Sequence, residues 1–559
     1  MKDKQTTTKG FAILSLAGVI NKFLALAYLP IQTMIVGNYG NGIISAGYKI
    51  YILIFALSNA GVPVAVSKLI SERTALGDFK GAQKIFRIAA LILIVLGVFF
   101  GSIMALGAGW ISKQIAQPNA TLMLLALSPA LLFTSISSVF RGYFQGRQNM
   151  IPSAISQVIE QALNSVLTIV FAALLIKYGI EKAAAGTTVG TSLGALGAAL
   201  FLVFFYKKSK SKRIEEMTSS NYNGPKITNE EVIKQILCYC LPAILGMIAI
   251  NASEIIDLKY GVSRMIEGGI SNIQATELYG ILTNQYQRVL NLPLAITATL
   301  PAVLIPAISS AKASKDKLLL YRKISESFKV ILIITIPSAV GLSILAKPII
   351  TFVFFSTKLN QGADLMQIGS WVMVIMAIIY VQTATLIGVG KAYIPPVNIL
   401  IGMIFKLIAN YFLIAVPTIN VKGAVIGSTL GFLITCVLNQ FAIRKNTGFS
   451  VKYVAISYRP FIASLIMGVV AYALYLLSDK FLFILIKNSL LRNDISVLLS
   501  VLVGASIYFV ILLHTNAIES NDILKLPGGS KINSFLIKKK YIKSKVNPLK
   551  QSTTKTSNP

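Results

Sequence analysis

The sequence is dominated by apolar segments that are each long enough to cross a lipid bilayer. A membrane-spanning helix needs about 20 apolar residues, and such segments recur along all 559 residues of the chain. Charged residues make up only 13% of the sequence, about half the share expected of a soluble domain. We therefore predict an all-α integral membrane protein with fourteen transmembrane helices. The expected helices cover residues 10–37, 43–71, 84–111, 120–142, 152–178, 183–206, 232–258, 277–310, 325–354, 362–388, 393–416, 421–444, 454–478 and 489–514.

The charge balance is strongly basic, with 52 Lys and Arg against 20 Asp and Glu. In a soluble protein this excess would suggest nucleic acid as a partner, but membrane proteins concentrate Lys and Arg in their cytoplasmic loops. With the N-terminus inside, 37 of the basic residues fall on the inner side and 12 on the outer side. We therefore expect both termini in the cytoplasm, no nucleic-acid partner, and a basic tail that lies near anionic lipid headgroups.

The residue types that most enzymes and metal sites need are scarce. The chain has three cysteines, all within apolar segments, and one histidine, so no zinc or disulfide framework is expected. A phosphate-binding glycine loop is also missing from the sequence. These features favour a transporter over an enzyme, with no metal and no organic cofactor.

Two blocks of sequence recur at nearly the same spacing. GRQNMIP at 146–152 matches GKAYIPP at 390–396, and AAAGTTVG at 183–190 matches AVIGSTLG at 424–431. The offsets are 244 and 241 residues, which corresponds to six spans. Because six is even, the copies have the same orientation, as in transporters built from parallel repeats.

This duplication predicts two six-helix lobes followed by two additional helices. The expected parts are an N-lobe at 10–206, a cytoplasmic linker at 207–231, a C-lobe at 232–445, helices 13 and 14 at 454–514, and a basic cytoplasmic tail at 515–559.

Charged residues inside the apolar segments are the first candidates for function, because a charge within a membrane usually faces a cavity or a partner. Lys22 lies in the middle of the first span and Arg288 in the outer half of the eighth. The planar guanidinium of arginine suits bidentate binding of phosphate. Lys49 lies at the outer start of the second span, either at the membrane interface or at the rim of the same cavity.

Four further charges suggest an ion site and a gate. Glu254 and Asp257 are three residues apart on one face of the seventh span. There they could hold a cation or a proton or simply be exposed at the membrane surface. Glu160 and Lys406 occupy nearly equivalent places in the two repeats. They could pair across the lobes and close one side, or each could have a local partner.

Helix-breaking residues cluster in the opening spans of each lobe. Proline inside a span bends the helix and frees a backbone carbonyl. We expect hinges that line a central cavity, with static kinks as the alternative. The candidate hinges are Pro30, Gly61, Pro63, Pro242 and Pro293.

Two segments carry a family resemblance. ALSNAGVPVAVSKLISE at 56–72, followed by ALG at 75–77, resembles the second-helix signature of the Gram-positive polysaccharide exporters. That branch includes stage V sporulation protein B-like proteins and lipid II flippases. LYGILT at 278–283, with NLPLA at 291–295 and IPAIS at 305–309, resembles the eighth helix of the same family. The family belongs to the multidrug/oligosaccharidyl-lipid/polysaccharide exporter superfamily.

The resemblance implies a two-lobe fold around a cationic cavity that receives a lipid-linked pyrophosphate sugar. Lys22 and Arg288 match basic positions of the family's first and eighth helices. Asp257 resembles an acid that in some relatives contributes to a sodium site. One departure follows Tyr28, where relatives commonly carry an arginine and this chain has Leu29, so the cavity should be less cationic.

The resemblance thus implies a flippase of the bacterial cell (inner) membrane that moves an undecaprenyl-pyrophosphate-linked glycan, with lipid II as the favoured substrate. It would work by alternating access, with Na+ or H+ as a possible coupling ion. Membrane lipids and cell-wall synthesis proteins are the further expected partners. The alternatives are a flippase for another polysaccharide repeat unit, a cation-coupled multidrug antiporter, and a non-transporting scaffold for cell-wall synthesis.

Overall fold

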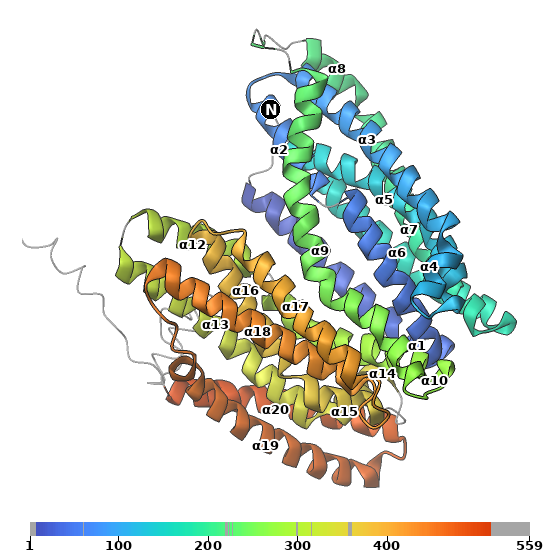
Figure 1. Ribbon diagram of the computed structural model, residues 1–559, viewed down its shortest axis with the longest axis vertical. Coiled ribbons are helices and arrows are strands. Elements are labelled where there is room, and N and C mark those ends of the chain that lie inside the picture. Colours follow the sequence, from blue (N-terminus) through green and yellow to red (C-terminus); the bar gives the residue numbers. More distant parts are fainter. Residues whose placement is uncertain are drawn as a thin grey trace, which may run out of the picture. The chain divides into compact units, whose positions relative to one another are not determined.

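The chain folds into helices throughout the part that the computed structural model describes (Figure 1). The described residues are 7–59, 61–218, 222, 224–225, 227–297, 300–314, 316–355 and 360–515. The predicted basic tail lies outside this range from residue 516 on. In chain order the helices are α1 (Thr7–Asn59), α2 (Val62–Ala75), α3 (Phe79–Leu106), α4 (Ala108–Gln114), η1 (Pro118–Ala120), α5 (Thr121–Gly146), α6 (Ile151–Leu175), η2 (Ile176–Tyr178), α7 (Ile180–Lys208), α8 (Lys210–Thr218), α9 (Asn229–Glu267), α10 (Asn272–Gly280), η3 (Ile281–Gln287), α11 (Arg288–Thr297), α12 (Leu300–Ala313), α13 (Lys317–Ile344), α14 (Ala346–Phe354), α15 (Asn360–Gly369), α16 (Val372–Gly388), α17 (Ile394–Leu413), α18 (Lys422–Thr447), α19 (Tyr453–Leu485) and α20 (Ser489–His514).

Most of these helices have the length and composition of membrane spans. Within the described residues, ten are long and apolar enough to cross a membrane, or up to eleven if the bent pair α15 and α16 is one span. One of the ten, Leu16–Ala75, covers two of the predicted segments. The all-helical membrane fold is therefore confirmed, whereas the count of fourteen spans stays a prediction.

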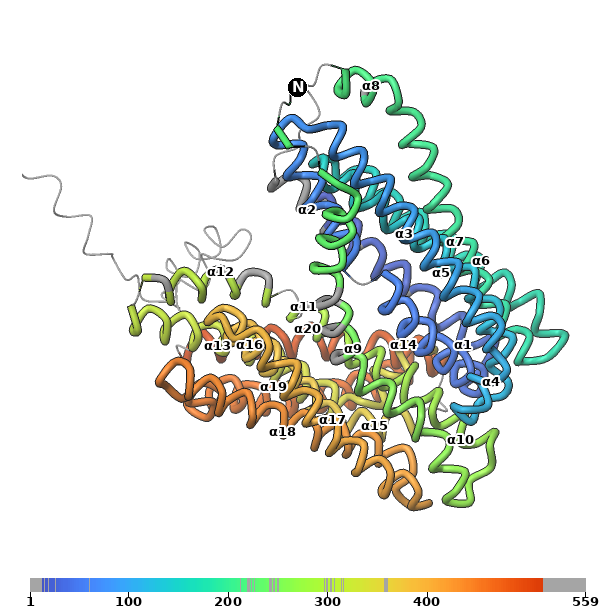
Figure 2. The backbone as a smooth tube through the Cα atoms, turned by 45° about the horizontal axis from the view of Figure 1, so that its top comes forward, coloured from blue at the N-terminus to red at the C-terminus, as the bar shows by residue number. Residues whose placement is uncertain are grey.

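The helices group into two compact units. The first comprises 1–289, 353–355 and 393–438, and the second comprises 290–352, 356–392 and 439–559. In the first unit α3 packs against α5, α5 against α7, and α7 against α6 (Figure 2), and α9 packs against α17. In the second unit α13 packs against α16 and α19, and α19 packs against α20. This division does not follow the predicted boundary between an N-lobe and a C-lobe, and the duplicated lobes stay a prediction.

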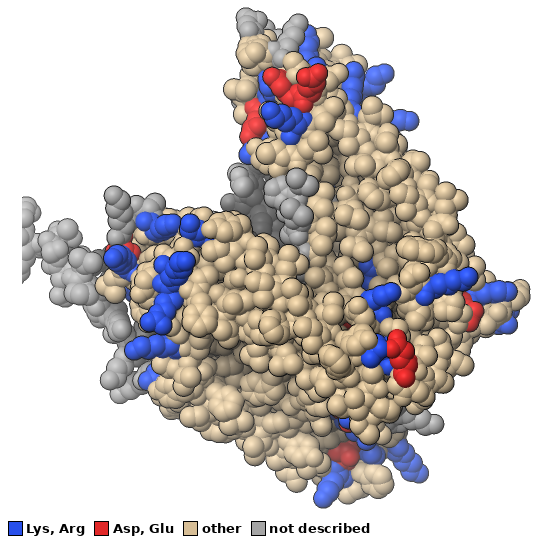
Figure 3. Space-filling view, in the orientation of Figure 1, with Lys and Arg blue, Asp and Glu red and all other residues tan. Residues whose placement is uncertain are grey.

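Aromatic side chains fill the core of the first unit where α3, α5 and α7 meet. Phe86 lies with its ring centroid 4.8 Å from those of both Tyr143 and Tyr206. In the second unit Val340, Met467 and Leu512 pack together. Charged side chains avoid the middle of the first unit on the face drawn in Figure 3 and gather near the helix ends. That distribution suits a protein whose middle contacts hydrocarbon.

The predicted hinges lie at or beside only some of the breaks in the helices. Pro30 is inside α1, and the non-helical residue of α1 is Gly37, with φ of 64°. Gly61 has φ of 78° and precedes α2, with Pro63 in the first turn, where proline is well tolerated. The break in α1 is thus at a glycine, between the first and second predicted spans, because glycine adopts this backbone conformation at little cost.

The eighth predicted span is divided into several pieces. Between α10 and α11 the chain forms a seven-residue π-helix, η3, a rare geometry that often occurs at functional sites. Pro293 lies inside α11, after this π-helix, and Pro242 lies within α9. The irregular backbone immediately before Arg288 is therefore the π-helix, which the sequence did not indicate.

Two glycines allow α1 and α10 to pack in close contact. A Cβ atom on Gly280 would come within 2.1 Å of the Asn38 carbonyl oxygen, and a Cβ on Gly42 within 2.1 Å of the Thr276 carbonyl oxygen. Both obstructions are backbone atoms, which cannot rotate away. Small residues at such contacts are typical of membrane helices that pack closely.

We therefore expect Gly280→Ala to force α1 and α10 apart and to lower the unfolding free energy by about 1–3 kcal/mol. Thermal unfolding of the detergent-solubilised protein measures this. Gly18→Ala is the matched control, because a Cβ there would meet no atom within 4 Å. Equal melting temperatures for the two variants would contradict the close contact.

Candidate functional site

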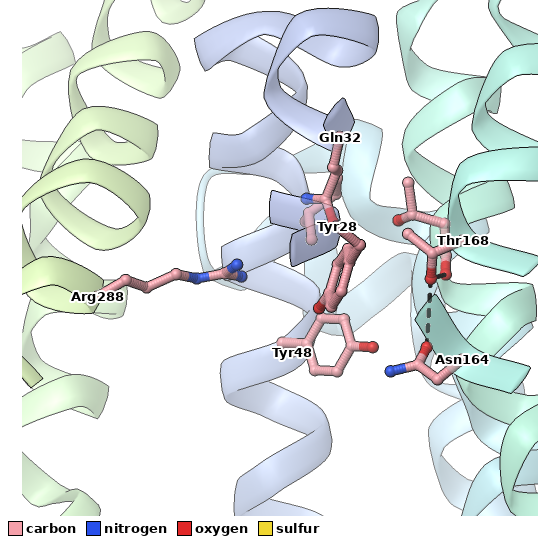
Figure 4. Close-up of a pocket in the computed structure, with 8 residues that line it drawn as sticks. Tyr28, Gln32, Tyr48, Asn164, Thr168 and Arg288 are labelled. Atoms are coloured by element: carbon pink, nitrogen blue, oxygen red, sulfur yellow. Dashed lines mark hydrogen bonds between the residues drawn. The ribbon is translucent and has the colours of Figure 1, made fainter. Parts of the chain in front are cut away.

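A polar cavity lies among the helices of the first unit and contains Arg288. Its volume is about 120 Å³. The close-up in Figure 4 shows the Arg288 side chain reaching towards α1, with the rings of Tyr28 and Tyr48 between it and Asn164. The lining residues are Tyr28, Gln32, Ile44, Tyr48, Asn164, Thr168, Thr187 and Arg288.

The π-helix η3 fixes the place of Arg288 by hydrogen bonds to α1. Thr283 donates from Oγ1 to Ser45 Oγ at 2.8 Å. The Asn284 and Gln285 amides donate to Thr33 Oγ1 at 3.0 Å and to Asn38 Oδ1 at 2.7 Å. These three consecutive η3 side chains are buried, so the backbone is anchored to α1 three residues before Arg288.

Hydrogen bonds between side chains on the two sides of Gly37 stabilise the bend of α1. Gln32 donates from Nε2 to Asn41 Oδ1 at 2.9 Å, and Asn41 donates from Nδ2 to Thr33 Oγ1 at 3.0 Å. Thr33 also accepts from η3, so the two arms of α1 and the π-helix share one hydrogen-bond network. The network holds Gln32 at the cavity wall.

The opposite wall comes from α6 and α7. Asn164 Oδ1 accepts from Thr168 Oγ1 at 3.2 Å and from Thr191 Oγ1 at 3.0 Å. Thr191 is also hydrogen-bonded to the Tyr48 hydroxyl. Asn164 is therefore oriented by two threonines, and its amide nitrogen is left for another partner.

A second polar cavity adjoins the first at Asn164. Its volume is about 220 Å³, and its lining is Asn21, Gln157, Glu160, Gln161, Asn164 and Thr191. Glu160 is paired with Arg141, whose Nη2 lies 2.6 Å from Glu160 Oε2. The carboxylate is therefore neutralised locally.

The three predicted phosphate-binding cations are not brought together. Arg288 lines the first cavity. Lys22 lies exposed on α1 next to Asn21 and lines neither cavity. Lys49 is paired with Glu254 at 2.6 Å. Arg288 is thus the only cation among the described residues that line the two cavities.

The predicted gate pair is not formed in this structure, and the alternative of local partners holds. Glu160 is bound by Arg141 rather than by Lys406. Lys406 is fully buried and lies 2.8 Å from Asp257 Oδ2. Its Nζ also donates to the carbonyl and the hydroxyl of Ser253, at 2.9 and 2.5 Å. The ammonium thus has three oxygen partners, which matches its three protons.

The two acids predicted to hold a coupling cation also have other partners. Asp257 accepts from Lys406 and, at 2.9 Å, from Asn410 Nδ2. Glu254 is held by Lys49. Each carboxylate is therefore neutralised by a lysine, and the two do not share an open site. Within the part of the chain that the structure describes, no group of three or more His, Cys, Asp or Glu side chains is placed to hold a metal ion.

The uncharged polar residues of both cavities were missed from the sequence. Asn21, Gln32, Gln157, Gln161 and Asn164 all lie within apolar segments. A carboxamide in the middle of a span is a signal of the same kind as a charge, because it also needs a partner in the membrane. Reading only the ionisable residues left these five out.

Comparison with known proteins shows relatives over most of the chain. The lipid II flippase MurJ of Bacillus subtilis (strain 168) is 27% identical over 517 residues, which covers 89% of this chain and 94% of that protein. The stage V sporulation protein B of the same organism is 28% identical over 457 residues, with 80% and 86% covered. These relatives confirm the resemblance carried by the second and eighth spans.

Two solved structures of transport proteins have the same fold as this chain. A structure of the lipid II flippase MurJ in an inward closed conformation aligns with a TM-score of 0.60 at 18% identity, covering 89% of this chain and 98% of that one. An inward-facing multidrug resistance MATE transporter aligns with a TM-score of 0.63 at 15% identity, covering 78% and 98%. At these identities the likeness establishes the fold alone.

The apolar helices and the membrane-transporter relatives together make this chain a multi-pass membrane protein. The model of the polysaccharide biosynthesis protein family matches residues 7–312, more than half of the sequence. The chain therefore belongs to the polysaccharide biosynthesis protein family.

Proposed function

We propose that this protein is a flippase that moves an undecaprenyl-pyrophosphate-linked glycan, with lipid II as the substrate, from the inner to the outer leaflet of the bacterial cell membrane. The observation that carries the proposal is Arg288, the only cation among the described residues that line a polar cavity between apolar helices. The guanidinium of a half-buried arginine suits bidentate binding of a phosphate. The relatives that cover most of the chain include a lipid II flippase.

The physical task is to bring a charged headgroup into the protein while the lipid tail stays in the bilayer. At an effective dielectric constant near 20, two opposite unit charges 4 Å apart attract by about 4 kcal/mol. Arg288 supplies that attraction, and Lys22 is proposed to join it in another stage of alternating access. Release requires the attraction to weaken on the outer side.

The proposed topology has both termini in the cytoplasm, and the proposed partners are the glycan lipid, membrane lipids and cell-wall synthesis proteins. A coupling ion, Na+ or H+, is also part of the proposal. In this structure Asp257 and Glu254 are neutralised by Lys406 and Lys49. An ion acting at either carboxylate would therefore have to displace an ammonium.

A second candidate is a flippase for a different lipid-linked glycan, such as a capsular or exopolysaccharide repeat unit. It is favoured by the single cation among the described residues of the cavity wall, and by Leu29, which stands where the family resemblance implies an arginine. A relative at 28% identity is a stage V sporulation protein. A multidrug antiporter is less well supported, because the lining residues of the first cavity include an arginine and no acid.

The test is rescue of a bacterium depleted of its own lipid II flippase, with the lipid II that an external probe reaches as the readout. Rescue together with restored external lipid II is the expected result. If the protein is present in the membrane and neither growth nor external lipid II returns, lipid II is not its substrate and the second candidate takes its place.

A further inference from the structure

The second cavity differs chemically from the one that contains Arg288. Among the described residues that line it, only Glu160 is ionisable, and Arg141 neutralises it at 2.6 Å. The other five lining side chains are four carboxamides and one hydroxyl. The cavity is therefore polar but offers no net charge to attract an ion.

Several polar groups of this wall still have hydrogen-bonding capacity. Gln157 is half-buried and makes no side-chain hydrogen bond to the described residues. The Asn21 Oδ1 atom also lacks a partner among them, but in this structure it is covered by protein. Gln161 uses its Nε2 on Ser165 Oγ at 3.2 Å, which leaves its carbonyl oxygen. Buried polar groups are usually satisfied, so this wall is complementary to a partner that both donates and accepts.

The second cavity is large enough to hold a ligand much bigger than one water molecule. Its 220 Å³ is many times the roughly 10–15 Å³ that one water molecule needs. A carboxamide has two donor protons and one carbonyl acceptor, which match the adjacent hydroxyls and amides of a sugar. A phosphate would instead be bound by cations and donors alone.

The cavity that contains Arg288 adjoins the second cavity, just as the diphosphate of a glycan lipid adjoins its first sugar. Asn164 lines both, so the uncharged wall begins where the pocket of Arg288 ends. Figure 4 shows Arg288 and Asn164 on opposite sides of the two tyrosine rings. In a lipid-linked pyrophosphoryl sugar the first sugar is bonded directly to the diphosphate, so a diphosphate held at Arg288 brings that sugar into the same cavity, whose far wall includes Asn164.

We propose that Asn21, Gln157, Gln161 and Asn164 form a sugar-binding subsite for the residue attached to the diphosphate. This inference rests on the proposed function and adds the part of the protein that selects the glycan. Arg288 binds what all such lipids share, and the carboxamides bind what differs between them. Gln157 and Gln161 are four residues apart on α6, so they face the same side of that helix.

The test compares two ligands that differ by one sugar, undecaprenyl pyrophosphate and undecaprenyl-pyrophosphoryl-N-acetylmuramic acid, on the purified full-length protein. Wild type is expected to bind the sugar-bearing lipid more tightly. Gln157→Leu and Gln161→Leu, which keep the approximate side-chain volume, should each weaken its binding about fivefold. Both should leave binding of undecaprenyl pyrophosphate unchanged. Gln274→Leu, at an exposed position of α10, is the matched control.

The outcomes separate the inference from the proposed function. Equal wild-type affinity for the two lipids, or full sugar preference in the Gln157→Leu/Gln161→Leu double variant, overturns the subsite and leaves the flippase proposal standing. Failure of wild type to bind either lipid overturns the proposed function and the subsite with it. A melting temperature equal to that of wild type shows that a variant is folded, and Gln157→Asn, which keeps the carboxamide, should retain part of the sugar preference.

Discussion

Arg288→Ala is expected to abolish transport and to leave the helices folded. Among the described residues that line the two cavities, Arg288 is the only cation, so its removal takes away the charge that attracts a phosphate. Two charge-assisted hydrogen bonds of about 1.5–3 kcal/mol each correspond to a loss of at least about 100-fold in binding. No hydrogen bond or ion pair to Arg288 is present within the described part of the chain, so the substitution leaves no buried partner unpaired.

The measurement is the amount of glycan lipid that an external probe reaches in flippase-depleted cells. Arg288→Lys should retain part of the activity, because lysine keeps the charge but loses the planar fork. Arg322→Ala is the matched control, since Arg322 is 68% exposed on α13 and pairs with Glu326 one turn away. Normal transport by Arg288→Ala would remove the cavity from the mechanism.

Lys22→Ala belongs in the same experiment. Lys22 lines neither cavity in this structure, so its predicted role depends on another stage of the cycle. Loss of transport in both variants would assign the two cations to one pathway. Loss in Arg288→Ala alone would leave Lys22 as an ordinary exposed lysine.

The second large effect is expected on stability at the buried ion pair of α9 and α17. The side chains of Lys406 and Asp257 are 0% and 3% exposed, and their charged atoms lie 2.8 Å apart. Lys406→Ala leaves a buried carboxylate without its cation, which typically costs about 3–5 kcal/mol. Loss of the ammonium also frees the two oxygens of Ser253 that it bonds.

A double-variant comparison tests this expectation by thermal unfolding in detergent. Lys406→Met combined with Asp257→Leu removes both charges and should be much more stable than Lys406→Ala, because no buried charge is left unpaired. Arg322→Ala, which breaks an exposed pair, should cost less than about 1 kcal/mol. If Lys406→Ala melts like wild type, the pair does not hold α9 to α17.

The sequence predicts where the membrane helices lie, but it does not predict which side chains the charged residues contact. Long apolar stretches predict helices because a membrane leaves the backbone few other ways to satisfy its hydrogen bonds. Where the structure describes the predicted spans, they are mostly helical, with short breaks such as those at Gly61 and Gly107. Glu160 and Lys406 were considered as a pair because they occupy matching places in two repeats. A matching place implies a similar local setting within each repeat, not contact, and each residue has a neighbour of its own, Arg141 and Asp257.

The candidate site was predicted only in part for a similar reason. Arg288 is conspicuous by its charge, but the side chains around it are uncharged, and among them only Thr187 lies in one of the repeated blocks. Their placement depends on the break at Gly37 and on the π-helix η3. Both are set by contacts between helices that are far apart in the sequence, such as Thr33 with Asn284.

The π-helix before Arg288 also makes the direction of that side chain depend on hydrogen-bond register. A π-helical turn bonds residue i to i+5 rather than i+4 and so contains one residue more than an α-helical turn. If η3 changed to α-helical bonding, the extra residue of the π-helical turn would be taken up by the helix. The helix that follows would then rotate about its axis by about 100° for each such residue. Arg288 is the first residue of that helix. A one-residue change of register in η3 would therefore turn the guanidinium away from Tyr28 and Tyr48. Neither end of the span would move along its axis by more than about one residue's rise.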